Sequence, residues 1–306
     1  MKFSIVTPSW NSEAYLAETI DSVISQKGDF DIEYIVQDNQ SGDRTCEIVR
    51  NYMAMLESGS YPIRCKSVSM RLISEPDTGM YDAINRGFSG ATGDVYAYIN
   101  SDDIYLPGAF QVVARCMALR PDVAWLKGIT SYINAGSAII AIGKCNLYCQ
   151  EWLRLGIYGR AAGFVQQDSV FWRAALWQTS GGCDSGLKVA GDYRLWMTFA
   201  QHARLYSVVA YLSCFRRVQG QLSENMEPYW REVNALSDGL CGLDSSIRGF
   251  RTREAILPRF LKLVFFRALF GTPQFDLLTV DVVGGVAAHR GDYYSVQSLI
   301  SPGVRG

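Results

Sequence analysis

The chain has 306 residues, of which 48% are hydrophobic and 19% charged, so it can bury a large core as one domain or as one domain with an appendage. Its formal net charge of −1 provides no basic field, and we expect no nucleic-acid partner. The eight cysteines include no Cys-x-x-Cys pair, which favours reduced thiols over a zinc site. The sequence begins with a strand-like segment rather than a secretory leader, and no apolar run reaches the roughly 18–20 residues of a membrane span. We therefore expect a cytoplasmic protein.

Residues 1–120 alternate between short apolar strands and helices. Such alternation is typical of parallel strands joined by crossover helices, so the predicted fold class is α/β with a mostly parallel central sheet. Ligands of open α/β sheets bind at the carboxyl edge of the strands, where the polar turns gather. Strands are predicted at 3–8, 33–37, 71–74 and 94–99, and helices at about 16–24, 45–56, 81–88 and from 109 onward.

The second half of the chain has a different pattern. Residues 123–142 predict two strands joined near 134–136. A helix is predicted at about 192–202 and a further strand at 206–215. The composition changes near residue 245, which is the predicted boundary between a main domain and a C-terminal extension.

Two adjacent carboxylates, Asp102 and Asp103, follow the apolar strand at 94–99. Hard divalent cations prefer carboxylate oxygens, and Mg²⁺ or Mn²⁺ commonly bridges one or two carboxylates to substrate phosphates. A turn in which Asp caps the following helix explains the same residues. On these residues alone both interpretations stay open.

Three further polar turns, at 7–11, 37–43 and 75–79, follow predicted strands. Together with residues 100–103 they would form a cleft at one edge of the sheet. The sequence contains neither a dinucleotide fingerprint nor a Gly-rich phosphate loop with Lys. The phosphates of a nucleotide bound there would therefore be neutralised mainly by a metal ion.

With these motifs in this order, the chain resembles glycosyltransferase family 2, the inverting nucleotide-sugar glycosyltransferases with the A-type fold. The resemblance covers about residues 2–225, and its five segments together are far more specific than any one of them. It implies a Rossmann-like nucleotide-binding half. The segments are 3–11, 34–43, 74–87, 91–103 and 191–196.

The resemblance implies a donor site at the sheet edge. Asp38 would contact the base, as the acceptor for uracil N3–H if the donor is a UDP-sugar, and Asp77 would help to close the nucleoside pocket. Asn85 and Arg86 would lie near the ribose or diphosphate. The remaining expected donor-binding residues are Thr7, Pro8, Ser9, Asn11 and Asp102.

The resemblance also implies the metal and the base. Asp103 would be the direct ligand of Mn²⁺ or Mg²⁺, with Asp102 nearer the ribose or sugar. Asp192 matches the catalytic base that accepts the proton of the attacking hydroxyl. From the residues alone, a helix N-cap is the favoured interpretation of Asp192.

Two positions depart from the family pattern. Gln37 stands where the first of two acids is usual, which leaves base recognition to Asp38 alone. Gln219 stands where many members have a metal-ligating His, and its amide oxygen is a weaker ligand than imidazole. Gln219 as a ligand and Gln219 as a surface residue both remain open.

For the acceptor site we expect Gln166 and Gln167 to bind hydroxyl groups and Trp196 to stack on a sugar face, although most aromatic residues between 152 and 196 are expected in the core. The basic and apolar segment 248–270 predicts a helix that lies on an anionic membrane surface. Packing of this segment against the catalytic domain, or against a second subunit in a homodimer, is the alternative.

The resulting hypothesis is a metal-dependent inverting glycosyltransferase that uses a nucleotide-sugar, preferably a UDP-sugar, and a saccharide or lipid-linked acceptor. Its catalytic domain would span 1–245, with a nucleotide-sugar half at 1–120 and an acceptor half at 121–245. A basic, apolar helical extension would span 246–306, with the protein peripheral to the inner membrane face. The alternatives are a sugar nucleotidyltransferase and a non-catalytic sugar-nucleotide or glycan-binding pseudoenzyme.

Overall fold

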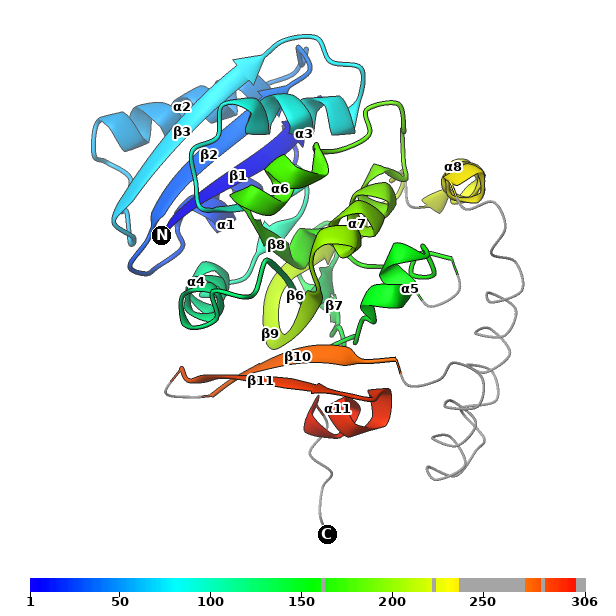
Figure 1. The fold of residues 1–306 in the computed structure, drawn as a ribbon. Coiled ribbons are helices and arrows are strands. Elements are labelled where there is room, and N and C mark those ends of the chain that lie inside the picture. The colour runs from blue at the N-terminus through cyan, green and yellow to red at the C-terminus, as the bar shows by residue number, and fades with distance from the viewer. Residues whose placement is uncertain (161–162, 222–223, 237–272, 282–283, 301–306) are drawn as a thin grey trace.

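The computed structural model describes residues 1–160, 163–221, 224–236, 273–281 and 284–300. An 11-stranded sheet runs through these residues, with the order β11-β10-β9-β6-β8-β4-β1-β2-β3 and with β5 and β7 paired onto β9 and β6 (Figure 1). The N-terminal half supplies four parallel strands: β1 (Lys2–Ser9), β2 (Asp31–Asp38), β3 (Ser67–Ser74) and β4 (Val95–Tyr98). This is the alternating α/β half that the sequence predicts.

Helices cover both faces of this half (Figure 1). Neighbouring apolar side chains of the central strands point to opposite faces of the sheet, so both faces are buried. Phe3 and Ile5 of β1 pack in one core cluster, whereas Val6 packs in a second. The first cluster takes in α1 (Leu16–Ile24), α2 (Thr45–Glu57) and α4 (Ala109–Leu119), and the second takes in α3 (Met80–Ser89), α6 (Ala174–Ser180) and α7 (Gly191–His202).

The second half extends the same sheet. As predicted, two strands form a hairpin, β6 (Trp125–Ile133) and β7 (Ile139–Ala141), and β6 also pairs in parallel with β9 (Leu205–Arg216). The antiparallel strand β8 (Val170–Arg173) lies between β6 and β4 and joins the two halves. The remaining elements here are β5 (Ile104–Tyr105), α5 (Gln150–Arg154), the 3-10 turn η1 (Gln167–Ser169) and α8 (Glu227–Leu236).

The C-terminal part differs from the expected helical extension. Residues 273–300 form a strand pair, β10 (Phe275–Val280) and β11 (Val286–Gly291), followed by α11 (Tyr293–Ile300). β10 pairs in parallel with β9, so this hairpin belongs to the central sheet. The predicted boundary near 245 and the segment 248–270 lie outside the described residues. None of the described helices is long and apolar enough to cross a membrane.

Candidate active site

A cavity of about 1100 Å³ opens at the carboxyl ends of β1 and β4. Pro8, Ser9 and Trp10 at the end of β1 line it, as do residues 100–102 after β4. Its other walls come from the turn after β3, the segment 164–167, the start of α7, the chain after β9, and the beginning of α8. The polar turns that the sequence places after successive strands therefore do meet around one cavity.

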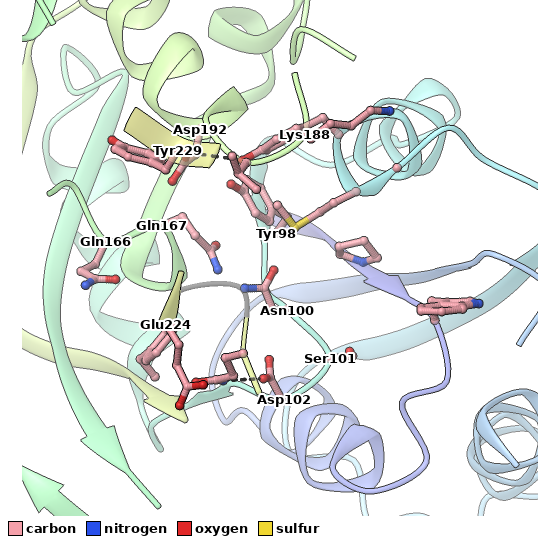
Figure 2. A pocket seen from close by; sticks show the side chains of 18 of the residues that line it. Tyr98, Asn100, Ser101, Asp102, Gln166, Gln167, Lys188, Asp192, Glu224 and Tyr229 are labelled. Atoms are coloured by element: carbon pink, nitrogen blue, oxygen red, sulfur yellow. Dashed lines mark hydrogen bonds between the residues drawn. The ribbon is translucent and has the colours of Figure 1, made fainter. Parts of the chain in front are cut away.

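Asp192 lies in the wall of this cavity, at the second residue of α7 (Figure 2). Its Oδ1 accepts hydrogen bonds from the Tyr193 N–H at 2.7 Å and from the Tyr81 hydroxyl at 3.4 Å. Among the described residues nothing donates a hydrogen bond to its Oδ2. Burial raises the pKa of Asp192 to about 6, against the opposing effect of those two hydrogen bonds. A carboxylate with this pKa is ionised at neutral pH and is a better proton acceptor than an exposed Asp.

Gly191 allows α7 to begin this close to α3. A Cβ at position 191 would lie 2.6 Å from the ring of Tyr81, a distance that real Cβ atoms do not show. Any larger residue would push the start of α7 away from Tyr81, which is buried and donates to Asp192. The Gly191-Asp192 pair is thus a local signal, in the sequence, of where the carboxylate is placed.

Several polar side-chain atoms in the cavity wall are buried and have no hydrogen-bond partner among the described residues. They are the hydroxyls of Ser9 and Tyr98, Asn100 Oδ1, and both amide atoms of Gln167. Buried polar atoms almost always have partners in native proteins, so each of these is explained best by a ligand or by ordered water. In Figure 2 Gln167 and Asn100 lie between Asp192 and Asp102. The cavity therefore offers a polar floor for a polyhydroxyl ligand.

The side chains of the two neighbouring acids after β4, Asp102 and Asp103, lie in different environments. Asp102 lines the cavity, and its Oδ2 accepts a hydrogen bond from Gln221 Nε2 at 2.9 Å. Asp103 is fully buried away from the cavity, and its Oδ1 accepts the Arg216 N–H at 2.8 Å. Burial, together with the charges of Asp102 and Asp168, holds the pKa of Asp103 well above its ordinary value. The resemblance implies Asp103 as the direct metal ligand, but in this structure Asp102, and not Asp103, lines the cavity.

Arg216 fixes the backbone of this acidic pair. Its side chain is fully buried, its Nε donates to the Asp102 carbonyl oxygen at 2.7 Å, and its Nη2 pairs with Glu18 of α1 at 2.7 Å. The guanidinium also lies 4.4 Å from the centre of the Tyr15 ring. The end of β9 is thereby tied to the turn after β4 and to α1.

The chain after β9 brings a glutamine to Asp102, although not the one expected. Gln219 and Gln221 both line the cavity, but the amide of Gln221 contacts Asp102 and also donates to the Arg216 carbonyl oxygen at 2.7 Å. Gln219 is exposed. Glu224 also lines the cavity, and its Oε2 accepts the Gly220 N–H at 2.9 Å. Gln221 and Glu224 are not among the residues predicted from the sequence, where their only signal is their position in the loop of Gln219.

Asp38, the expected base-binding residue, is buried in its own turn and does not line the cavity. Its carboxylate accepts hydrogen bonds from both Ser41 N–H (3.0 Å) and Ser41 Oγ, from Ser74 Oγ at 2.7 Å, and from Cys46 Sγ at 3.1 Å. Burial opposes its ionisation, but these hydrogen bonds outweigh burial and lower the pKa of Asp38. Asn39 lines the cavity in its place.

Four of the predicted donor-binding residues line the cavity as expected: Pro8, Ser9, Asp77 and Asp102. The others do not line it and instead form hydrogen bonds within the surrounding structure. Asn85 exchanges two hydrogen bonds of 2.9 Å with the backbone of Cys183 in the loop that leads to α7. Arg86 pairs with Asp82 at 3.0 Å and donates to the Pro76 carbonyl oxygen. Thr7 Oγ1 is buried against the Tyr34 hydroxyl at 2.9 Å, and Asn11 Oδ1 accepts the Gly42 N–H at 2.9 Å.

Of the expected acceptor residues, Gln166 and Gln167 line the cavity and Trp196 does not. Trp196 is 3% exposed and stacks on Trp125, with ring centres 5.7 Å apart. Its place on the inner side of α7, one turn beyond Asp192, makes it part of the core. The aromatic side chains that do line this part of the cavity are Phe164, Tyr132, Phe215 and Tyr229.

A metal ion would find few protein ligands in the cavity. Over the described parts of the chain, no cluster of three or more His, Cys, Asp or Glu side chains is arranged to hold one. Asp102 and the unpartnered Asn100 Oδ1 are nevertheless hard oxygen donors of the kind that Mg²⁺ and Mn²⁺ prefer. Mg²⁺ commonly uses one or two carboxylates and takes its other ligands from water and substrate phosphates. The donor set fits a metal that a diphosphate helps to hold.

Known proteins share both the sequence pattern and the fold. An uncharacterized glycosyltransferase of Rickettsia prowazekii is 22% identical over 205 residues, which cover 66% of this chain and 60% of that protein. A PGL/p-HBAD biosynthesis glycosyltransferase of Mycobacterium bovis is 36% identical over 104 residues, which cover 33% of this chain and 35% of that protein. The chain spans between about a third and 60% of the length of the first curated relatives it matches.

Solved structures show the same fold. The S. aureus TarS 1–349 crystal structure in complex with UDP-GlcNAc aligns with a TM-score of 0.57 and 17% identity, over 88% of this chain and 71% of that one. The mannosyltransferase PcManGT from Pyrobaculum calidifontis, in complex with GDP-Man and Mn²⁺, aligns with a TM-score of 0.51 and 14% identity, over 88% and 69%. The predicted A-type glycosyltransferase fold is thereby confirmed. Residues 4–155 match the sequence profile named Glycosyl transferase family 2. With this match, the curated relatives and the fold in agreement, the chain belongs to glycosyltransferase family 2.

Proposed function

We propose that this protein is an inverting glycosyltransferase that moves a sugar from a nucleotide-sugar, preferably a UDP-sugar, to a saccharide or lipid-linked saccharide. The observation that carries the proposal is Asp192, whose Oδ2 is free among the described residues and whose pKa burial raises to about 6. The bound UDP-GlcNAc and GDP-Man of the structural neighbours support a nucleotide-sugar as donor. Because the two neighbours bind different nucleotides, they do not decide the base of the donor, and we choose UDP as the first nucleotide to test.

In the proposed reaction Asp192 accepts the proton of the acceptor hydroxyl while that oxygen forms a bond to the anomeric carbon. The bond between the anomeric carbon and the diphosphate oxygen breaks at the same time, and its electron pair leaves with the diphosphate. Inversion follows from this single displacement, which passes through an oxocarbenium-like state as in glycoside hydrolysis. Mn²⁺ or Mg²⁺, held by Asp102 and Asn100 Oδ1, would supply Lewis-acid stabilisation of the leaving diphosphate.

We assign donor binding to one end of the cavity and acceptor binding to the other. We place the nucleotide near Pro8, Ser9, Asn39 and Asp77, which come from the ends of the parallel strands, and the acceptor near Gln166, Gln167 and Tyr229. The donor half at 1–120 and the acceptor half at 121–245 thus remain our proposed division of the catalytic domain. Membrane attachment through 248–270, homodimer formation and a place at the inner membrane face also remain proposals, to be tested by sedimentation with anionic liposomes and by light scattering.

The non-catalytic alternative would need no ionised carboxylate aimed into the cavity. Calorimetry against UDP, GDP, dTDP and CMP, with and without Mn²⁺, tests the binding part of the proposal. We expect one nucleoside diphosphate to bind more tightly with Mn²⁺, and Asp102→Ala to remove that gain. The proposed diphosphate site would be contradicted if CMP were the only one of the four nucleotides to bind. It would also be contradicted if Mn²⁺ changed the nucleotide affinity of neither the wild type nor Asp102→Ala.

A further inference from the structure

The start of α7 carries the proposed base and lacks a cap of its own. The first N–H groups of a helix have no partners within the helix and need acceptors from elsewhere. Ala190 occupies the N-cap position of α7 and has no side chain that can accept a hydrogen bond. Asp192 itself accepts the Tyr193 N–H, so it is the N–H of Ala190, together with those of the turn before it, that needs an acceptor from another part of the chain.

Glu232 of α8 supplies that acceptor, although it lies 42 residues beyond Ala190 in the chain. Its Oε1 accepts the Lys188 N–H at 2.8 Å, and its Oε2 accepts the Val189 N–H at 3.0 Å and the Ala190 N–H at 2.9 Å. A single carboxylate thus binds three consecutive backbone N–H groups immediately before α7 begins. Hydrogen bonds to an ionised carboxylate are shorter and stronger than neutral ones, and a negative charge at a helix N-terminus is favourable.

The same helix also forms part of the cavity wall. Tyr229 and Val233 of α8 are buried in one cluster with Ala190, Tyr193 and Met197 around the start of α7. Met226 and Tyr229 line the cavity that Asp192 faces. One side of α8 therefore contacts the space for substrate, while Glu232 binds the backbone two to four residues before the base.

We propose that Glu232 is a positioning residue for the transfer reaction, which fixes the start of α7 and so aims the Asp192 carboxylate into the cavity. The inference rests on the proposed function, because it assigns to Glu232 a role that acts through the proposed base. Without Glu232, three N–H groups lose their acceptor and the turn at 188–190 loses its restraint. Asp192 then moves relative to the acceptor hydroxyl, and a displacement of about 1 Å can cost about 100-fold in rate.

The pH dependence of turnover reports the position of Asp192. Burial raises the pKa of each of the titratable neighbours, Tyr81 of α3, Tyr98 of β4, Cys183 in the preceding loop and Tyr229 of α8, so they stay neutral near pH 6. Burial also raises the pKa of Asp77, but Asp77 lies at the proposed nucleotide end and would affect donor binding. We therefore assign an acidic limb of kcat near pH 6 to Asp192. If α7 loosens, water reaches the carboxylate and the uncapped N–H groups favour its charge, so the limb moves to lower pH. The other charged side chains that line the cavity or lie at the start of α7 are Asp77, Asp102, Lys188, Arg217, Glu224 and Glu232 itself.

The experiment compares Glu232→Ala and Glu232→Gln with the matched control Glu227→Gln, which removes an exposed carboxylate from the same helix. In the full-length protein we measure kcat across pH 4.5–8, the affinity for UDP with Mn²⁺, and the melting temperature. For Glu232→Ala we expect kcat to fall about 10–100-fold, with UDP affinity within about twofold of wild type and the acidic limb displaced downward. Glu232→Gln keeps one acceptor oxygen and should lose less, and Glu227→Gln should match wild type.

An unchanged kcat and acidic limb in Glu232→Ala would overturn the inference. So would a fall in kcat that parallels the loss of folded protein and of UDP affinity, because that result describes a structural role only. If Glu232→Ala does not fold, Glu232→Gln decides by the same two criteria. An active Asp192→Asn would instead refute the proposed base itself, whatever the Glu232 variants do.

Discussion

Replacing Asp192 by asparagine should make the folded protein more stable at neutral pH. The fold raises the pKa of this carboxyl from its ordinary 3.8 to about 6, because the surrounding cavity wall desolvates this half-buried side chain. Folding therefore favours the neutral form, and the stability associated with that form is lost as the pH rises from 3.8 through 6. One pKa unit corresponds to about 1.4 kcal/mol, so the ionised carboxylate costs up to about 3 kcal/mol above pH 7. The asparagine side chain of the variant does not ionise and avoids this cost, and its oxygen can still accept the Tyr193 N–H.

Urea denaturation at two pH values measures this difference. At pH 7.5 we expect Asp192→Asn to unfold with a free energy up to about 3 kcal/mol larger than wild type, and at pH 4.5 the gain should shrink to about 1 kcal/mol. The control is Asp29→Asn, since Asp29 is 90% exposed in a surface pair with Lys66, and we expect little change at either pH. A gain that is the same at both pH values, or a loss of stability at pH 7.5, would refute the assignment of a half-buried, ionised Asp192 whose pKa the fold raises.

Three further substitutions separate the parts of the cavity. Gln221→Ala removes the hydrogen bond to Asp102 and should weaken nucleotide binding in the presence of Mn²⁺ about 3–10-fold, as measured by calorimetry. Gln219→Ala should change this affinity less than twofold. If Gln219→Ala has the larger effect, Gln219 and not Gln221 supports the metal. Gln167→Ala should raise KM for the acceptor about tenfold or more and leave nucleotide affinity unchanged, and equal loss of both would contradict an acceptor role. Trp196→Ala should lower the free energy of unfolding by about 3–5 kcal/mol, because the side chain is core; an intact stability with a raised acceptor KM would show instead that it contacts the sugar.

The sequence was enough to predict the parallel half and the edge at which the cavity lies. β1, β2 and β4 are short runs rich in apolar residues, and the polar turns follow directly, so local pattern and fold agree there. Asp192 could likewise be placed at the start of a helix facing the cleft, because the apolar residues of α7 recur at helical spacing.

The division of roles between Asp102 and Asp103 could not be predicted, because it depends on contacts that are distant in the chain. The Asp103 carboxylate accepts a hydrogen bond from the N–H of Arg216, 113 residues later, and the Asp102 carboxylate accepts one from the side chain of Gln221. Asp38 is similar, since Ser74 and Cys46 help to satisfy a carboxylate that the resemblance assigned to a ligand. A motif identifies the residue type, but burial and hydrogen bonds decide which neighbour faces the ligand.

The C-terminal hairpin was missed for a different reason. The basic and apolar residues of 248–270 predict a helix, and the expected helical extension carries that prediction over to the residues that follow. The run that became β10 is apolar and followed by Gly284 and Gly285, a strand and turn signal that was present in the sequence. Its pairing with β9 is non-local and has no signature in the residues themselves.

The central claim, that Asp192 is the base of a transfer reaction, is tested most directly by sugar transfer from the identified donor to an acceptor glycan by Asp192→Asn. The account predicts that the rate falls by at least about 100-fold at pH 7.5 while calorimetry finds nucleotide affinity within about twofold of wild type. Transfer at the wild-type rate by this variant would contradict it.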